Sequence, residues 1–354
     1  MSAVEVNTLV DNSAAGGTAA AADDVFLTGT PLPDIPGLVL RHLRPPDDYA
    51  AMNVLANEVR IAQGMDFTTS DEQFQAFYEN PPNSDPAKDV VVADLDGRLV
   101  GYGRASWHQE PDGPRIYEAN LFVGQNLPDG VLTAVLDAME ARLRVIAADD
   151  PAGEKLFETF GSEQDAERDR LLRQRGYAPT RYFFSMVRPT MDDLPDAPLP
   201  AGLEIREVLP EHLPAIWAAD QEAFADHWGF APATESDYQR FLTDPATSDT
   251  TLWRVAWDGD QIAGQVRSYV NAPENERLGR KRGYVEFISV RRPWRRRGLA
   301  RALIAASFPL LRARGMQEGA LGVDAENTSG ALRVYENCGF RRVSSSTVYR
   351  KPLS

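Results

Sequence analysis

The sequence predicts an α/β (α+β) protein made of two tandem copies of one fold, each a mixed, mostly antiparallel sheet flanked by helices on both faces. Its 354 residues exceed the roughly 250–300 at which a single hydrophobic core stops growing. Short markers recur in the same order at a displacement of about 163 residues. The second copy also interleaves short strand-like runs with segments of helical spacing.

Four markers define the repeat, and each pairs a position in the first copy with one in the second. They are residues 37–41 with 202–206, 96–101 with 258–264, 176–177 with 339–340, and 188–189 with 351–352. Each match is short, but a shared displacement in a shared order indicates a duplicated fold.

Proline content sets the expected domain boundaries. Four prolines fall within residues 189–200, and such a segment continues neither a helix nor a central strand. We therefore expect a degenerate N-terminal domain over 36–189, a stiff linker over 190–200 and a catalytic C-terminal domain over 201–354. Residues 1–25 are small and polar without periodicity, which predicts a disordered leader.

Local patterns predict the elements of the second copy. In its first half, residues 203–208 alternate like a strand, and 211–224 have helical spacing. Strands over 252–257 and 261–270 flank an Asp-Gly-Asp turn, which predicts a hairpin. The second half continues as strand, amphipathic helix, strand, helix and strand, expected at 283–290, 300–314, 320–323, 328–337 and 345–349.

Charge is distributed unevenly between the two copies. The formal net charge is −15, and the residues from Leu203 onward carry 21 basic and 19 acidic side chains. The preceding residues therefore carry 16 basic and 33 acidic side chains, a balance of −17. We expect the two halves to differ in function.

Composition excludes several classes of protein. No run approaches the roughly 18–20 consecutive apolar residues of a membrane span, and the N-terminus lacks the basic and apolar regions of a signal peptide. The single cysteine, Cys338, cannot form an internal disulfide. We expect a cytoplasmic protein, monomeric or homodimeric, that binds no membrane.

An arginine-rich loop between a predicted strand and a predicted helix is the most informative segment. The helix after Gly298 begins with unpaired backbone N–H groups and a partial positive charge. Gly298 and Ala300 keep that backbone accessible, and nearby guanidinium groups add charge-assisted donors. These groups belong to Arg291, Arg292, Arg295, Arg296, Arg297 and Arg301. The setting predicts a polyphosphate site.

An arginine run of this kind can also form a solvated surface or a nucleic-acid contact. The strand-loop-helix setting, with Pro293 and Trp294 inside the run, favours a defined anion site. A nucleoside-triphosphate loop is not expected because no Gly-Lys-Ser/Thr follows, and the single glycine excludes the dinucleotide fingerprint. We expect no nucleic-acid partner.

Two segments of the C-terminal copy carry family motifs. Residues 295–300 fit the pattern Q/R-x-x-G-x-G/A, with Ala300 in the last place. Residues 327–340 look like N-x-x-A-x-x-x-Y-E-x-x-G-F with one additional residue between Asn327 and Ala331. Together they resemble the two motifs of the GNAT N-acetyltransferase superfamily. The resemblance covers residues 203–353, and two copies with one intact motif set resemble a mycothiol synthase-like tandem arrangement.

The resemblance implies that acetyl-CoA is the co-substrate. Backbone N–H groups of the loop would bind the pyrophosphate, the strand at 288–290 would bond the pantetheine arm as an added strand does, and Asn327 would contact the same arm. The implied cofactor-binding residues are Ile288, Ser289, Val290, Arg295, Arg296, Arg297, Gly298, Leu299, Ala300, Arg301 and Asn327. The family more commonly has glycine at the position of Arg296.

The resemblance also implies two catalytic residues. Tyr335 matches the motif tyrosine that protonates the CoA sulfur, with a packed helix tyrosine as the alternative. Glu286 lies in the strand from which family members place a base, although the commonest glutamate position falls on Tyr284. Alternation puts Glu286 and Tyr284 on one face, and a solvent-facing charge is the alternative for Glu286.

Residues after the first helix of this copy lie where the family forms its acceptor pocket. Asp226, His227 and Trp228, together with Tyr284, are the expected substrate-binding residues, with ordinary loop packing as the alternative. The four histidines of the chain show no metal-ligand spacing, so we expect no metal.

The first copy departs from these motifs. The segment after its strand 119–123 has no arginine, and Asp129 would repel phosphate. Alignment of the copies places Leu172 at the position of Tyr335 and Gln164 at that of Asn327. We expect this copy to keep the fold without catalysis.

The predicted function is that of an acyl-CoA-dependent N-acyltransferase. It would move an acetyl group from acetyl-CoA to a primary amine of a small molecule by direct attack, in the C-terminal domain. The alternative is a coenzyme A-binding regulatory or scaffold protein without turnover, against which the intact Tyr335 argues. The acidic first copy would attract a cationic acceptor or simply aid solubility.

Overall fold

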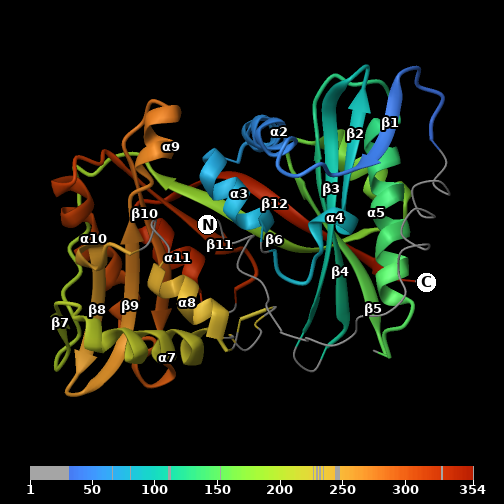
Figure 1. Ribbon diagram of the computed structural model, residues 1–354. Helices are drawn as coiled ribbons and strands as arrows, with labels where there is room; N and C mark the ends of the chain where they lie inside the picture. The colour runs from blue at the N-terminus through green and yellow to red at the C-terminus, as the bar shows by residue number, and fades with distance from the viewer. Residues whose placement is uncertain are drawn as a thin grey trace. The chain divides into compact units, whose positions relative to one another are not determined.

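The computed structural model describes residues 32–353, apart from 66, 80, 111–112, 152, 226, 229, 231–232, 234, 244–247 and 328–329. The predicted leader over 1–25 lies outside the described residues. The chain forms two compact units (Figure 1). Residues 183–345 make up the C-terminal unit, and the described residues up to 182 together with those from 346 onward make up the N-terminal unit. No helix in the described ranges has the length and apolar character needed to cross a membrane.

The sheet of the N-terminal unit runs in the order β1-β2-β3-β4-β5-β12. Its first four strands are antiparallel neighbours, β5 is parallel to β4, and the last residues of β12 are antiparallel to β5. The strands are β1 (Leu38–His42), β2 (Val90–Leu95), β3 (Arg98–Gln109), β4 (Arg115–Val123), β5 (Lys155–Ser162) and β12 (Arg341–Pro352).

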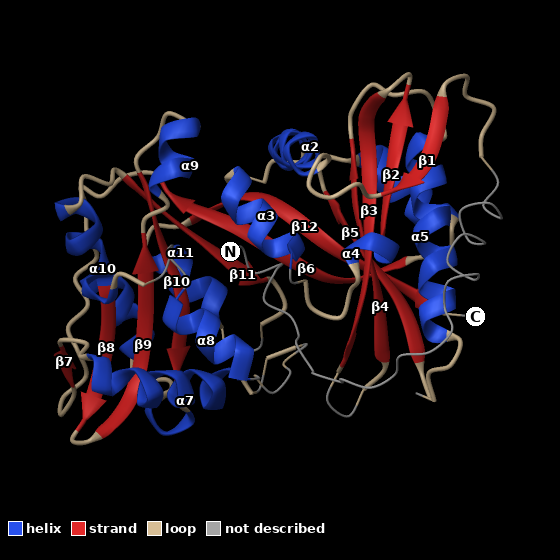
Figure 2. Cartoon of the chain, viewed as in Figure 1, coloured by secondary structure: helices blue, strands red, loops and turns tan. Residues whose placement is uncertain are grey.

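Helices cover both faces of this sheet (Figure 2). The long helix α5 (Val131–Ala147) forms one core with residues such as Tyr117. On the other face, α2 (Tyr49–Ala62) and α3 (Asp71–Glu79) form a second core with Tyr102. The two remaining described helices are α4 (Pro86–Asp89) and α6 (Ala166–Gln174).

The sheet of the C-terminal unit repeats this plan in the order β7-β8-β9-β10-β11-β6. The neighbouring strands from β7 through β10 are antiparallel to one another. β11 is parallel to β10, and β6 is antiparallel to β11. The strands are β7 (Glu204–Arg206), β8 (Trp253–Asp258), β9 (Gln261–Tyr269), β10 (Arg282–Val290), β11 (Glu318–Asp324) and β6 (Ala178–Arg188).

The helices of the C-terminal unit bury two separate cores. The apolar stripe of α10, which includes Leu303 and Phe308, packs with Val285 of β10. Ile216 of α7 and Phe241 of α8 form a smaller core with the tryptophans of β8. The helices are α7 (Leu213–Phe224), α8 (Glu235–Thr243), α9 (Ala272–Arg277), α10 (Leu299–Ala313) and α11 (Ala331–Asn337), with 3₁₀ turns η1 (Pro210–His212), η2 (Thr250–Leu252) and η3 (Arg292–Trp294).

The last strand of each sequence repeat completes the sheet of the other unit. Residues 183–188 of β6 pair with β11, and residues 346–352 of β12 pair with β5. The two units therefore have other boundaries than the predicted domains 36–189 and 201–354, because the final strand of each repeat pairs within the sheet of the other unit. The segment 190–200, expected to be a linker between domains, lies within the C-terminal unit.

The predicted fold class and its duplication are confirmed. In each unit a run of antiparallel strands precedes one parallel pair, β4 with β5 and β10 with β11. The predicted elements of the second copy are present with shifted ends. The strand predicted over 203–208 shortens to β7, and the strand predicted over 345–349 is part of the longer β12.

Candidate active site

The parallel strands β10 and β11 run together at first and then separate. Register pairs join residues 282–284 of β10 to 318–320 of β11. Within the described chain, no pairing between these strands follows, although β10 continues to Val290 and β11 to Asp324. We call the space between the diverging strands the gap. A strand edge without a partner leaves backbone groups to which an extended ligand can bond.

A β-bulge in β10 lies at the start of the gap. The register with β9 shifts between Glu286 and Ser289, and Phe287 has a φ of 50°, a region that a bulky residue rarely adopts. The guanidinium of Arg267 lies 4.1 Å from the centroid of the Phe287 ring and pairs with Asp220 at 2.8 Å. A buried ion pair therefore packs against the strained residue that redirects the strand.

Glu286 lies on β10 beside the bulge. The Tyr269 hydroxyl of β9 donates to Glu286 Oε2 over 3.3 Å. Burial raises the pKa of Glu286, while bonds from the Tyr269 hydroxyl and the backbone N–H of Gly322 on β11 oppose the shift. A carboxylate with a raised pKa suits a general base that works near neutral pH.

Tyr284 lies on the same face of β10 as Glu286, but its hydroxyl is already hydrogen-bonded to another carboxylate. It donates to the buried carboxylate of Glu274, and Arg280 bonds to both groups. The Tyr284 ring stacks on that of Tyr269, with centroids 4.9 Å apart and planes inclined by 12°. A phenol that is bonded to a carboxylate is a poor base, so Glu286 is the better candidate on this face.

Tyr335 lies on α11 and is only 8% exposed. Burial raises its pKa, and the Cys338 thiol and the Glu286 carboxylate add to the shift. Its hydroxyl makes no hydrogen bond to any residue that the structure describes. A phenol that keeps its proton and has no partner can donate that proton to a leaving group. Tyr335 and Glu286, the two predicted catalytic residues, are thus electrostatic neighbours.

The arginine-rich loop leads from β10 into α10. Arg296 has a φ of 62°, and Gly298, the N-cap of α10, has a φ of 82°. Space is open on the side of Gly298 where a Cβ would lie. Left-handed residues at the start of a helix turn successive backbone N–H groups outward, which is a common arrangement for binding anions.

The side chains of the loop arginines have different roles. Arg295 points into the protein, where it donates to the carbonyls of Val290 at 2.9 Å and Ala223 at 3.0 Å. Arg296 and Arg297 are exposed at the surface, as is Arg301 in the first turn of α10. Arg295 therefore anchors the loop, whereas the exposed Arg297 and Arg301 donate to the Ala201 carbonyl at 3.4 Å and the Asp196 carbonyl at 3.2 Å.

The other predicted cofactor-binding residues lie along β10, at the start of α10 and after β11. Ile288, Val290, Ala300 and Asn327 are half-buried, and Ser289 and Leu299 are buried. Asn327 follows β11 in a turn, where its backbone N–H donates to the Asp324 carbonyl over 3.2 Å. The loop, the bulged strand and this turn all belong to the C-terminal unit.

Three of the four predicted acceptor residues follow α7 in the sequence, and the fourth, Tyr284, lies on β10. Asp226 lies outside the described residues. His227 is exposed, with its ring 4.4 Å from that of Phe224. Trp228 is half-buried, with its ring 6.3 Å from that of Phe183. In the ranges that the structure describes, no group of three or more histidine, cysteine or acidic side chains could hold a metal ion.

Sequence reasoning missed the polar groups that surround Glu286 and its bulge. Asp220 is 4% exposed on α7, among the apolar residues that face the sheet. Its Oδ1 accepts from Gln265 Nε2 at 2.7 Å, and its Oδ2 accepts from Arg267. The sequence signal for these groups was an aspartate within the apolar stripe of a helix. A buried charge requires a partner, so Asp220 indicated a nearby basic or polar side chain.

Comparison with known proteins identifies the family. A family profile described as Acetyltransferase (GNAT) family matches residues 213–340. A mycothiol acetyltransferase of Streptomyces scabiei is 32% identical over 288 residues, which cover 74% of this chain and 91% of that protein. The chain belongs to the GNAT family of acetyltransferases. A mycothiol acetyltransferase of Thermobispora bispora is 29% identical over 308 residues, covering 86% of this chain and 97% of the relative.

Solved structures agree with the GNAT assignment. A GCN5-related N-acetyltransferase from Sphaerobacter thermophilus matches with a TM-score of 0.69 and 25% identity, over 91% of this chain and 97% of that one. A tandem GNAT protein from the clavulanic acid biosynthesis pathway matches in fold with a TM-score of 0.63 and 15% identity, over 90% and 99% of the two chains.

In the N-terminal unit, α5 corresponds to α10, and the Pro33 side chain lies against its N-terminal end. Asn126 and Gly130 have φ values of 56° and 106°, so the loop before α5 also uses left-handed residues. A Cβ on Gly130 would lie 3.2 Å from a side-chain atom of Pro33, which precedes β1. Asp129 is exposed beside this helix start. A phosphate at this helix start would therefore meet the Pro33 side chain and the negative charge of Asp129.

The corresponding gap of the N-terminal unit is filled by a side chain. Residues 115–119 of β4 pair with 155–159 of β5 before the strands separate. Beyond that point the buried guanidinium of Arg168, from α6, donates to the carbonyls of Leu121 and Phe160, each at 3.2 Å. These are backbone groups that an added strand would need, so Arg168 occupies the place of an extended ligand.

Two further positions complete the difference between the units. Leu172, which corresponds to Tyr335, is fully buried in the core. Gln164, which corresponds to Asn327, is bonded to the Ser162 hydroxyl. The N-terminal unit therefore repeats the strand order of the C-terminal unit without a tyrosine at the position of Tyr335 or an asparagine at that of Asn327.

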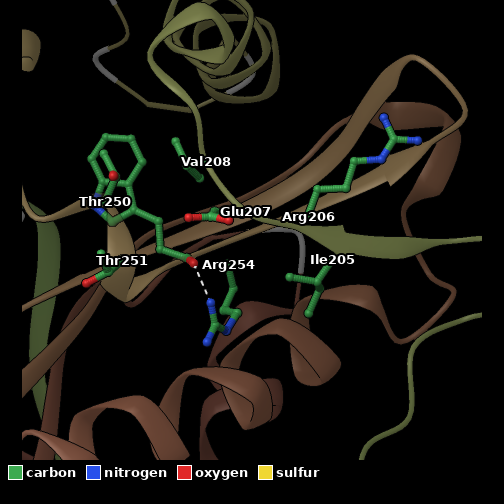
Figure 3. A pocket seen from close by; sticks show the side chains of 8 residues that line it. Ile205, Arg206, Glu207, Val208, Thr250, Thr251 and Arg254 are labelled. Carbon is green, nitrogen blue, oxygen red and sulfur yellow. Dashed lines mark hydrogen bonds between the residues drawn. The ribbon is translucent and has the colours of Figure 1, made fainter.

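A cavity of about 540 Å³ lies apart from these features, at the sheet edge formed by β7 and β8 (Figure 3). The Arg254 guanidinium in its wall donates to the Trp253 carbonyl over 2.9 Å. The complete lining is Ile205, Arg206, Glu207, Val208, Thr250, Thr251, Trp253 and Arg254. None of the predicted site residues is among them, so the cavity is separate from the GNAT site.

Proposed function

We propose that the C-terminal unit moves an acetyl group from acetyl-CoA to a primary amine of a small molecule by direct attack. The observation that carries the proposal is the electrostatic interaction between the Glu286 carboxylate and the Tyr335 phenol. Glu286 is a carboxylate with a raised pKa, and Tyr335 is a phenol with a raised pKa whose hydroxyl bonds to no described residue. One group can accept a proton and the other can supply one.

The loop and the gap would hold acetyl-CoA. Backbone N–H groups between Arg296 and Arg301 would bind the pyrophosphate, supported by the left-handed backbone at Arg296 and Gly298. The pantetheine arm would bond along residues 288–290, where β10 has no partner strand on the side of the gap. The Asn327 side chain would contact the same arm.

The reaction needs one proton acceptor and one proton donor. Glu286, directly or through a water molecule, would take a proton from the acceptor's ammonium group. The neutral nitrogen would then attack the thioester carbonyl, so that an N–C bond forms. As the C–S bond breaks, Tyr335 would protonate the departing thiolate. The resulting tyrosinate would take the second proton from the attacking nitrogen, which becomes the neutral amide, and Glu286 would release its proton to solvent.

The relatives indicate which acceptor to test first. Mycothiol acetyltransferases match most of this chain at 29–32% identity, so a mycothiol-related amine heads the panel. His227, Trp228 and Tyr284 are the described residues proposed to contact it, and the stacked ring of Tyr269 extends the wall beside Glu286.

Release of free coenzyme A thiol tests the proposal. The full chain with acetyl-CoA and a panel of amines should release thiol with at least one amine, and mass spectrometry should detect the acetylated product. Binding of acetyl-CoA without thiol release for any amine would contradict acyl transfer and favour the regulatory alternative.

A calorimetric titration tests the assignment to one unit. The filled gap and covered helix start of the N-terminal unit support one acetyl-CoA per chain. Two equivalent sites per chain would contradict the assignment to the C-terminal unit alone.

A further inference from the structure

Arg188, at the end of β6, is tied to the helix that carries Tyr335. It is 6% exposed, and its Nη1 donates to the Cys338 carbonyl over 2.6 Å. Its Nη2 donates to the Asp193 carbonyl, and the guanidinium lies 5.1 Å from the centroid of the Phe308 ring. The side chain is therefore fixed on several sides.

The Cys338 carbonyl lies at the C-terminus of α11, where helix carbonyls lack internal partners. The Cys338 N–H donates to the Tyr335 carbonyl over 2.9 Å, and the Phe340 N–H donates to the same carbonyl over 3.1 Å. α11 has only seven residues, and a helix this short depends on its surroundings for stability. A cation at this end both satisfies a carbonyl and complements the helix dipole.

Aromatic packing provides a second connection from Arg188 to Tyr335. The Phe308 ring, against which the guanidinium packs, lies 5.9 Å from that of Phe340, which in turn lies 6.5 Å from the Tyr335 ring at an interplanar angle of 70°. Gly339 leaves room for this arrangement, because a Cβ there would overlap Arg188 Nη1.

The same contact recurs in the N-terminal unit. Lys351, at the end of β12, donates from Nζ to the Arg175 carbonyl over 3.2 Å, and Arg175 is the C-cap of α6. Lys351 also pairs with Glu140 at 2.6 Å. In both units, a basic side chain from the last strand of the other repeat thus donates to a carbonyl at the C-terminal end of a helix. Arg188 does so at α11, and Lys351 does so at α6. In the N-terminal unit that helix carries Leu172 where α11 carries Tyr335.

We propose that Arg188 is a positioning residue for Tyr335, supplied to the C-terminal unit by the first repeat of the sequence. The inference rests on the proposed role of Tyr335 as proton donor. It also assigns a task to the first repeat, which has lost its own site. Its final strand delivers the side chain that fixes the end of the catalytic helix.

The matched pair Arg188→Met and Lys351→Met, made in the full chain, separates positioning from stability. Each change removes the cation from one helix end, so both variants should lower Tm by a few degrees. Arg188→Met should lower kcat about ten- to a hundredfold, because small displacements of a catalytic group are costly. Its KM for acetyl-CoA should stay within about threefold, and Lys351→Met should keep the wild-type kcat.

The outcomes distinguish the two proposals. A wild-type chain that releases no thiol with any amine overturns the proposed function itself. An active wild type together with a folded Arg188→Met of unchanged kcat, or with Lys351→Met losing as much kcat, overturns the positioning role. Arg188→Lys, which retains a donor for the Cys338 carbonyl, should recover part of kcat. If Arg188→Met fails to fold, wild-type kcat in Gly339→Ala, whose Cβ would overlap Arg188 Nη1, overturns the role.

Discussion

The two units of this GNAT protein share one strand order and differ in what occupies the gap between their parallel strands. In the C-terminal unit Glu286 lines the gap beyond residues 282–284, where no strand among the described residues pairs with β10. In the N-terminal unit Arg168 bonds to the carbonyls on both sides of the equivalent gap. The scaffold depends on many core contacts, whereas a site depends on a few side chains, so duplication can preserve the first while the second is lost.

The N-terminal unit differs in three features from the proposed site of the C-terminal unit. Arg168 fills the gap, Pro33 lies against the glycine that begins α5, and Leu172 replaces the tyrosine. Arg168 would block binding of the pantetheine arm, Pro33 would block binding of the pyrophosphate, and Leu172 cannot donate a proton. No single substitution is therefore expected to restore acetyl-CoA chemistry to this unit, and the comparison is best tested by changes at matched positions.

Tyr335→Phe should have the largest effect. Removal of the proton donor is expected to lower kcat about 100- to 10,000-fold while acetyl-CoA affinity changes little, because the ring and its packing remain. Steady-state thiol release and calorimetry measure the two quantities.

The matched change in the N-terminal unit is Leu172→Ala. Leu172 is fully buried, so this change should lower the free energy of unfolding by about 2–5 kcal/mol and leave kcat per folded molecule unchanged. Similar kinetic losses in the two variants would show that Tyr335 acts through stability alone.

Glu286→Gln should have the next largest effect and should alter the pH profile. Burial raises the pKa of Glu286, and a base must be deprotonated to act, so wild-type kcat/KM should fall as pH falls through that raised pKa. Glutamine cannot titrate, so the variant should lose about 10- to 100-fold in kcat/KM above that pKa and lose this limb of the profile. Persistence of the same limb in the variant would assign it to another group.

Gly339→Ala and Gly176→Ala should have smaller and unequal effects. Both glycines follow the C-cap of the second helix with φ values near 85° and 82°, so an alanine costs about 1–2 kcal/mol of unfolding free energy at either position. Only Gly339 faces Arg188, whereas Gly176 has open space where its Cβ would lie.

Gly339→Ala should therefore also displace Arg188 and reduce kcat, whereas Gly176→Ala should affect stability alone. Chemical denaturation and kinetics on both variants provide the comparison. Equal kcat values would mean that the Arg188 contact is not linked to turnover.

Much of the fold could be predicted from the sequence, because its signals are local or repeated. Alternation, helical spacing and the displacement of about 163 residues predicted the elements and the duplication. The exchange of β6 and β12 could not be predicted, since the last strands of both repeats end in the same basic-Pro pattern. A strand's pattern specifies that it is buried in a sheet and leaves open which of two similar sheets it joins.

The sequence motifs indicate candidate residues for the site, whereas the tertiary contacts around these residues could not be predicted from the motifs. Tyr335 and Glu286 follow from their places in the motif helix and strand. The sequence alone does not distinguish Arg295 from the neighbouring arginines, yet in the fold its side chain donates to the carbonyls of Val290 and Ala223. Side-chain direction in a loop is set by carbonyls that come from distant parts of the chain.

Arg296 provides the last and smallest test of the comparison. Its φ of 62° is similar to the 56° of Asn126 in the N-terminal loop, and both conformations favour glycine. Arg296→Gly should raise the free energy of unfolding by up to about 1 kcal/mol. Asn126→Gly should gain less, because asparagine tolerates this region better than arginine does. If backbone N–H groups supply most of the phosphate binding, Arg296→Gly should change the KM for acetyl-CoA by less than about threefold. A tenfold increase would instead assign a direct phosphate contact to the Arg296 side chain, and Asn126→Gly, in a loop without a phosphate site, should leave KM unchanged in either case.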